Sequence, residues 1–178
     1  MPVGDYKGSH PRLGERVFID EMASVIGDVV LDEDVSVWPM AVVRGDVNWI
    51  RVGARSNIQD GTVIHVTHDG PYTPDGGIPT VIGEEVTVGH KCLIHACTVG
   101  DRCLVGMGAI LMDGVEVGDE VIIGAGSLVT PGKKLESGWL YRGSPARPAR
   151  ELTAEEREQL AYSARHYVRL KDDYLSAR

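Results

Sequence analysis

The stretch TVGDRCLVGMGAILMDGVEVGDEVIIGAGSLVTPGKKL, residues 98–135, decides the fold because an aliphatic residue recurs at every sixth position. A period of six fits neither an amphipathic helix, with apolar residues three and four apart, nor an alternating strand of period two. Six residues can hold a short strand and a turn, with the aliphatic side chain inward and a glycine taking backbone angles that others avoid. The recurring residues are Val99, Val105, Leu111, Val117, Ile123, Val129 and Leu135.

The same spacing continues toward the N-terminus in an earlier phase. A one-residue slip separates the two phases, between Ile94 and Val99, and indicates a tighter corner. Three six-residue units make one triangular coil of 18 residues, and stacked coils bury a continuous aliphatic column. The earlier residues of the repeat are Val52, Ile58 and Ile64, then Ile82, Val88 and Ile94, with Val37 and Val43 less regular.

This pattern resembles the left-handed parallel β-helix of hexapeptide-repeat proteins. The resemblance alone implies the left hand, because the general rule for parallel crossovers favours the right. The alternative, an all-β sandwich, would show alternation of period two, which is scarce here. The sequence therefore predicts an all-β fold, a single domain over residues 1–178 with the β-helix over about 17–148.

Two segments break the repeat. Residues 66–81 (VTHDGPYTPDGGIPTV) are rich in Gly, Pro and Asp, and predict a loop that leaves the coil. Thr153 and Glu156 form a capping-box pattern that predicts a helix over about 153–175. The apolar residues of this helix fall mostly on one face, with Lys, Arg and Asp on the other. We expect it to pack on its own or a neighbouring subunit.

The composition of the chain excludes several classes of binding partner and cellular location. The 18 basic and 26 acidic side chains leave a net charge of -8, which argues against nucleic acid. No apolar run is long enough to span a bilayer, and the start has no secretion-signal pattern. Three cysteines without C-x-x-C spacing make no disulfide framework. These features predict a cytoplasmic protein without a membrane partner.

Three histidines are candidate metal ligands. His65 and His95 each follow an inward aliphatic residue, and 30 residues separate them, one coil of 18 plus 12. If the loop accounts for the extra 12, the two stack on coils about 4.8 Å apart and can reach one metal ion. His90 emerges near a different edge, so it completes the site only from the next subunit of a trimer. Three neutral imidazoles and a water are the open arrangement of catalytic zinc.

Three motifs, in this order and spacing, resemble the signature of the gamma-class carbonic anhydrases. They are Arg44-Gly-Asp46, Asn57-Ile-Gln-Asp-Gly-Thr-Val-Ile-His65 and Gly89-His-Lys-Cys-Leu-Ile-His95. The resemblance implies a homotrimer with zinc between subunits, held by His65 and His95 of one chain and His90 of its neighbour. Iron or cobalt would suit the same ligands. The implied activity is the reversible hydration of carbon dioxide to bicarbonate, a lyase reaction.

Further roles follow from the resemblance and from position in the hexad. Gln59, one hexad before His65, is expected to hydrogen-bond the nucleophilic water or hydroxide. Arg44 and Asp46 resemble a pair that ties adjacent subunits and borders the site, and Asp60 is expected to support Arg44 or the interface. Asn57 is a plausible supporting group, and Tyr141 a candidate for the pocket mouth. His10, His68 and His166 are interpreted as surface residues, and Cys92 and Cys97 as small buried apolar residues.

One departure lowers the expected rate. The archetypal gamma enzymes carry a glutamate directly after the first-motif aspartate and an acidic loop after the first metal histidine. Here Val47 occupies that position, and the loop offers only Asp69 and Asp75. Two alternatives stay open: a thioesterase or acyltransferase acting on acyl-CoA, and a catalytically silent, metal-binding trimeric scaffold. Transferases of this fold use a loop histidine without a metal triad, so the ligand spacing disfavours them.

Overall fold

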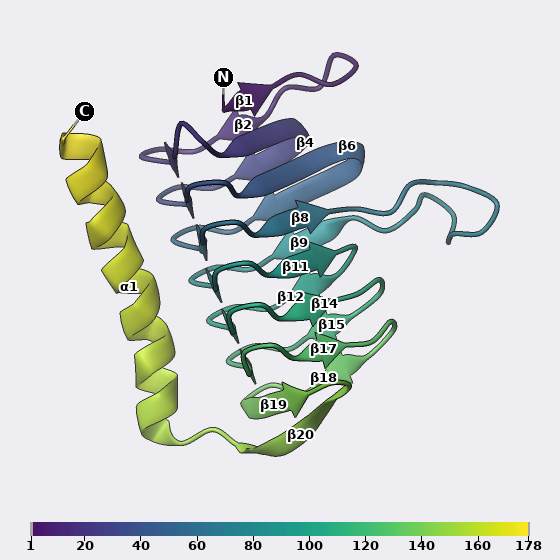
Figure 1. The fold of residues 1–178 in the computed structure, drawn as a ribbon, viewed down its shortest axis with the longest axis vertical. Coiled ribbons are helices and arrows are strands. Elements are labelled where there is room, and N and C mark those ends of the chain that lie inside the picture. The colour runs from purple at the N-terminus through teal and green to yellow at the C-terminus, as the bar shows by residue number, and fades with distance from the viewer. Residues whose placement is uncertain (1, 178) are drawn as a thin grey trace.

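Short strands stack into a three-sided solenoid, and one long helix lies along its side (Figure 1). The structure is a computed structural model and describes residues 2–177. Each coil adds a strand to each side, so most strands pair with those one coil before and one coil after. The predicted all-β fold, a parallel β-solenoid with a C-terminal helix, is confirmed.

One side of the solenoid, here called the helix face, lies under the helix. Its last two strands pair antiparallel, and its other strands pair parallel. The strands are β3 (Phe18–Ile19), β5 (Ser36–Val37), β7 (Asn57–Ile58), β10 (Thr87–Val88), β13 (Leu104–Val105), β16 (Ile122–Ile123), β19 (Trp139–Gly143) and β20 (Ala146–Glu151).

The other two sides belong to a second sheet. The histidine face consists of β8 (Val63–His65), β11 (Leu93–His95), β14 (Ile110–Leu111) and β17 (Leu128–Val129). The third face consists of β9 (Thr80–Ile82), β12 (Thr98–Val99), β15 (Glu116–Val117) and β18 (Lys134–Leu135). Near the N-terminus, one long strand per coil runs through both sides, and two short strands pair with the first. These are β4 (Ser24–Leu31), β6 (Val42–Val52), β1 (Val3–Gly4) and β2 (Arg12–Leu13).

Inward aliphatic side chains form one column through the solenoid. On the helix face, Ile58 pairs in register with Val88, and Val88 with Val105. All three are fully buried. Because neighbouring coils lie about one strand spacing apart, stacked side chains remove one another from water. The period of six thus produces a continuous apolar core.

The glycines that follow the inward aliphatic residues serve close packing between coils. A Cβ at Gly53 would lie 2.6 Å from the carbonyl carbon of Gly83, and one at Gly83 would lie 2.8 Å from that of Gly100. These glycines do not have positive φ. Positive φ occurs two residues later, at Glu85 (57°) and Arg102 (51°), and in other units at a glycine, as expected, such as Gly108 (69°) and Gly126 (67°).

The predicted loop leaves the solenoid between β8 and β9, and projects to one side (Figure 1). It spans residues 66–79, because β9 begins at Thr80. Thr67 and Ile78 form an antiparallel bridge at its base. The Asn48 amide donates to the carbonyl oxygens of Thr67 (3.0 Å) and Gly76 (2.8 Å). The base of the loop is therefore tied to the neighbouring coil.

The C-terminal helix α1 (Ala154–Ser176) packs on its own chain. Trp38, next to β5, meets the rings of Tyr167 and Tyr174 at centroid distances of 5.7 and 5.3 Å. Lys171 was expected on the polar face, but its side chain is fully buried and lies 2.8 Å from Asp34. Among the described residues, no helix is long and apolar enough to cross a membrane.

The helix start gives a pH-dependent prediction. The Thr153 hydroxyl accepts from the Glu156 backbone, and Glu156 accepts from the Thr153 backbone and from Arg150. The Arg150 guanidinium and the Thr153 backbone lower the pKa of Glu156 to about 2. Because the pKa is depressed, this cap stabilises the helix above the unfolded value of about 4.3 and is lost as pH falls toward 2.

NMR titration of the Glu156 carboxyl should therefore give a pKa near 2. Arg150→Ala should raise the pKa of Glu156 toward the ordinary value, because the hydrogen bonds from the Arg150 guanidinium contribute most to lowering it. A wild-type Glu156 pKa near the ordinary value of about 4.3 would contradict the capping geometry.

Candidate metal site

His65 and His95 lie side by side on adjacent coils. They end β8 and β11 and are register partners, as the spacing predicts. The two ring centroids are 5.3 Å apart, and His65 Nδ1 lies 3.3 Å from His95 Nε2. The loop absorbs the extra residues of their separation, which brings the imidazoles into line.

Each of the two rings has one nitrogen that points away from the other ring, and a carboxylate lies within hydrogen-bond distance of that outer nitrogen. His65 Nε2 lies 2.9 Å from Asp46 Oδ1, and His95 Nδ1 lies 2.7 Å from Asp113 Oδ1. Burial raises the pKa of Asp46, but hydrogen bonds from His65 and Arg44 outweigh it and leave the pKa below its ordinary value. The pKa of Asp113 is lowered in the same way, by Thr67 and His95 against burial. Both carboxyls are therefore ionised near neutral pH.

The inner nitrogens of the two rings face each other. An ionised carboxylate only accepts hydrogen bonds, so each neutral ring directs its N–H outward, and both inner nitrogens carry lone pairs. Two lone pairs held 3.3 Å apart suit a shared cation. Two nitrogen ligands of a tetrahedral zinc, each about 2.0–2.1 Å from the metal, lie about 3.3–3.4 Å apart. The residues present thus fit two positions of such a site.

His90 lies at a different corner, where the helix face meets the histidine face. It follows β10, and its Nδ1 lies 2.9 Å from Asp60 Oδ2. Among the described residues its Nε2 has no hydrogen-bond partner. Within residues 2–177, no group of three or more His, Cys, Asp or Glu side chains comes together to hold a metal ion. One chain therefore brings together His65 and His95 and keeps His90 apart.

A pocket of about 440 Å³ opens beside His90, between the helix face and α1. Gln59 lines it and is 5% exposed, and its amide nitrogen donates to Asn57 Oδ1 at 3.1 Å. Asn57 in turn donates to Thr87 Oγ1 at 3.1 Å. Gln59 and Asn57 therefore accompany His90, whereas Asp46 accompanies His65. The remaining lining is mainly apolar and includes Leu104, Met107, Ile122 and Tyr167.

The other expected residues are placed as follows. Arg44 forms an ion pair with Asp46, so this pair borders His65. Asp60 pairs with His90 and not with Arg44. Tyr141 is buried at the end of the core, where its hydroxyl accepts from the Glu136 backbone N–H. Burial raises the pKa of the Cys92 and Cys97 thiols to about 11 and about 12, in keeping with small apolar residues.

Sequence reasoning missed Asp113 and Thr67. Asp113 stands 18 residues after His95, one coil later, so the same coil arithmetic contains the signal. Thr67 is the second residue of the loop and has no register partner among the repeats. Its hydroxyl donates to Asp113.

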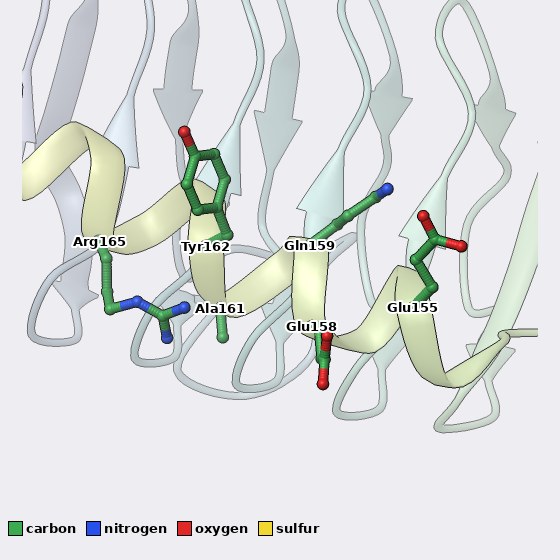
Figure 2. Close-up of a pocket in the computed structure, with 6 residues that line it drawn as sticks. All are labelled: Glu155, Glu158, Gln159, Ala161, Tyr162 and Arg165. Atoms are coloured by element: carbon green, nitrogen blue, oxygen red, sulfur yellow. The ribbon is translucent and has the colours of Figure 1, made fainter.

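Another hollow, of about 490 Å³, lies on the helix α1 itself. Figure 2 shows its side chains fanning out from one helix, with Tyr162 and Glu158 directed to opposite sides. Only helix residues line it: Glu155, Glu158, Gln159, Ala161, Tyr162 and Arg165. No histidine and no residue of a strand lines this hollow, so it is not a candidate site.

The fold defines a hexapeptide-repeat protein. The family described as "Bacterial transferase hexapeptide (six repeats)" matches residues 96–131. The family described as "Hexapeptide repeat of succinyl-transferase" matches residues 79–111. A solved structure described as a hexapeptide transferase family protein from Anaplasma phagocytophilum superposes with a TM-score of 0.89 at 42% identity, covering 97% of each chain.

Relatives that match nearly the whole chain identify the family within the hexapeptide-repeat proteins. "Carbonic anhydrase" from Geobacillus kaustophilus is 39% identical, over 97% of this chain and 90% of the relative. "Gamma carbonic anhydrase 2, mitochondrial" from Arabidopsis thaliana is 45% identical, over 93% of this chain and 59% of the relative. "Protein YrdA" from Escherichia coli is 57% identical, over 96% and 92%. The chain belongs to the gamma carbonic anhydrase-like family, as its three sequence motifs predicted.

Proposed function

We propose that this protein is a zinc-dependent carbonic anhydrase whose site lies between subunits of a homotrimer. His65 and His95 of one chain and His90 of the next would hold the metal, with iron or cobalt as alternatives. The observation that carries the proposal is the pair of inward nitrogens 3.3 Å apart, each ring held from behind by a carboxylate. Relatives named carbonic anhydrase support the reaction.

The surface between the two corners supports a second copy as the neighbour. The histidine face carries outward aliphatic side chains in register, Val63, Leu93 and Ile110, each 37–42% exposed. Their burial against another chain would be favourable, because apolar surface contributes about 25 cal/mol per Å² removed from water. A heterologous contact that closes after three copies would bring the His90 corner of one chain to the His65 corner of another.

Different residues of the chain would then have different roles in the reaction. Bound zinc supplies a Lewis acid that makes hydroxide available near neutral pH. Asn57 holds the Gln59 amide nitrogen, which leaves the Gln59 oxygen to accept a hydrogen bond and orient the nucleophile. The apolar lining of the pocket, including Leu104 and Met107, suits carbon dioxide, an uncharged molecule of low polarity. Asp46, ionised beside Arg44, holds the His65 ring.

Proton release is expected to limit the rate. Val47, next to Asp46, is 43% exposed and cannot carry a proton. Asp69 accepts from the Gly76 backbone within the loop. We expect hydration to rise with imidazole buffer concentration, because a small base can replace the missing shuttle. A thioesterase or acyltransferase acting on acyl-CoA is the second candidate, and the match to transferase-type repeats supports it.

Protein purified without chelator should carry about one zinc per chain, one for each interface of a cyclic trimer. Stopped-flow assays should show carbon dioxide hydration and no hydrolysis of acetyl-CoA. His65→Ala should lose both zinc and hydration. His68→Ala, which removes a loop histidine, should keep both. Zinc with acetyl-CoA hydrolysis and no hydration would favour the thioesterase, and a trimer without metal would refute the proposal.

A further inference from the structure

Asp113 links one candidate ligand to the base of the loop. Its Oδ1 lies 2.7 Å from His95 Nδ1, and its Oδ2 accepts from the Thr67 hydroxyl. Each carboxylate oxygen therefore has its own partner. Because a carboxylate with both oxygens engaged cannot rotate freely, the contact to Thr67 fixes the direction from which Asp113 approaches the ring.

The backbone around these two residues is itself held. The Asp113 carbonyl accepts from the Gly132 backbone N–H of the next coil at 2.9 Å. Thr67 exchanges backbone hydrogen bonds with Ile78 at 2.9 and 3.0 Å, and its carbonyl accepts from Asn48 at 3.0 Å. Neither end of the Thr67–Asp113 contact lies on a free segment, so the contact can transmit position to His95.

We propose that Asp113 positions His95 for metal binding, and that Thr67 holds Asp113 in place. The proposal rests on the proposed function, since it concerns the same site. A carboxylate on Nδ1 keeps the proton there and leaves the lone pair of Nε2 directed at His65. Partners of this kind orient ligand rings, and their removal weakens metal affinity by about 10–100-fold. Asp113 acts through His95 and does not itself touch the metal or substrate.

The test measures zinc affinity by competition with a chelator and does not depend on hydration activity. Asp113→Ala should weaken zinc binding by about 10–100-fold. Asp113→Asn should restore most of the affinity, because its amide oxygen still accepts from His95 and its NH₂ can donate to Thr67. Thr67→Val should weaken binding in the same direction but less. Asp75→Ala, in the same loop, should leave the affinity unchanged.

The tautomer of His95 in the metal-free protein gives an independent reading. Nitrogen-15 NMR should find the proton on Nδ1 in the wild type and a shift toward Nε2–H in Asp113→Ala. If the wild type binds no zinc, the proposed function fails, and the tautomer still decides the role of Asp113. An Asp113→Ala protein with wild-type affinity or a wild-type tautomer would overturn the inference.

Discussion

Two inactive variants, mixed, should regain activity. In the proposed trimer, His65→Ala removes a ligand from one half of every site, and His90→Ala removes the ligand from the other half. Each variant alone should fall to the uncatalysed rate of hydration. When subunits are mixed equally and allowed to reassemble, a site is complete only if its His65 comes from a His90→Ala chain and its His90 from a His65→Ala chain. About one quarter of the sites meet that condition.

The matched control mixes His65→Ala with His95→Ala. Both residues come from the same chain in every site, because they are register partners on adjacent coils. No combination of these two variants rebuilds a site, so no activity should return. Hydration and zinc content are measured on the reassembled trimers. Recovery in the control mixture, or none in the first, would contradict a site divided between chains in this way.

Asp34→Ala should cost about 3–5 kcal/mol of the free energy of unfolding, the range for breaking a buried ion pair. Lys171 is fully buried, and its Nζ lies 2.8 Å from Asp34, whose side chain is 7% exposed. Arg16 also donates to Asp34, from Nε at 3.0 Å. Without Asp34, the one acidic partner left to the ammonium group within residues 2–177 is Asp172, which is half-exposed. The ammonium group would then have lost its buried partner, and its charge would be balanced only in part.

The double variant Asp34→Ala with Lys171→Met should recover much of the loss, because an apolar side chain replaces the stranded charge. Asp173→Ala, at an exposed helix position, should change stability by less than about 0.5 kcal/mol. Chemical denaturation at one fixed protein concentration measures all four proteins, since oligomer stability depends on concentration. A loss under 1 kcal/mol for Asp34→Ala would show that the ion pair does not hold the helix.

The sign of the pH effect follows from the same contact. Burial raises the pKa of Asp34, but hydrogen bonds from Arg16 and Lys171 outweigh it and leave the pKa below its ordinary value. The ion pair therefore contributes stability above the unfolded pKa of about 3.9. This contribution is lost as pH falls through the lower folded value.

The period of six was enough to predict the solenoid, because the inward position of each unit is readable from a single residue type. Together with the predicted loop, which accounts for 12 residues, it was also enough to stack His65 on His95. Asp113 obeys the same count but was not predicted, because an aspartate in a turn is ordinary in a repeat. Thr67 could not be predicted, because its contact depends on the path by which the loop leaves the coil.

The burial of a charged side chain was the second feature that could not be predicted from the sequence. Lys171 falls at a position where the helix pattern has both apolar and charged neighbours, and only the position of Asp34, more than a hundred residues earlier, explains its burial. The role of the glycines was also misjudged. Their function depends on the distance between coils, which a sequence pattern does not contain.

The position of the metal tests the central claim most directly. Crystals of the zinc-loaded protein, measured at the zinc absorption edge, should give one anomalous peak per chain. The account predicts a peak between His65 Nδ1 and His95 Nε2 of one subunit, completed by His90 of its neighbour. A peak beside His90 and Asp60 of a single chain, or none near the histidines, would contradict it.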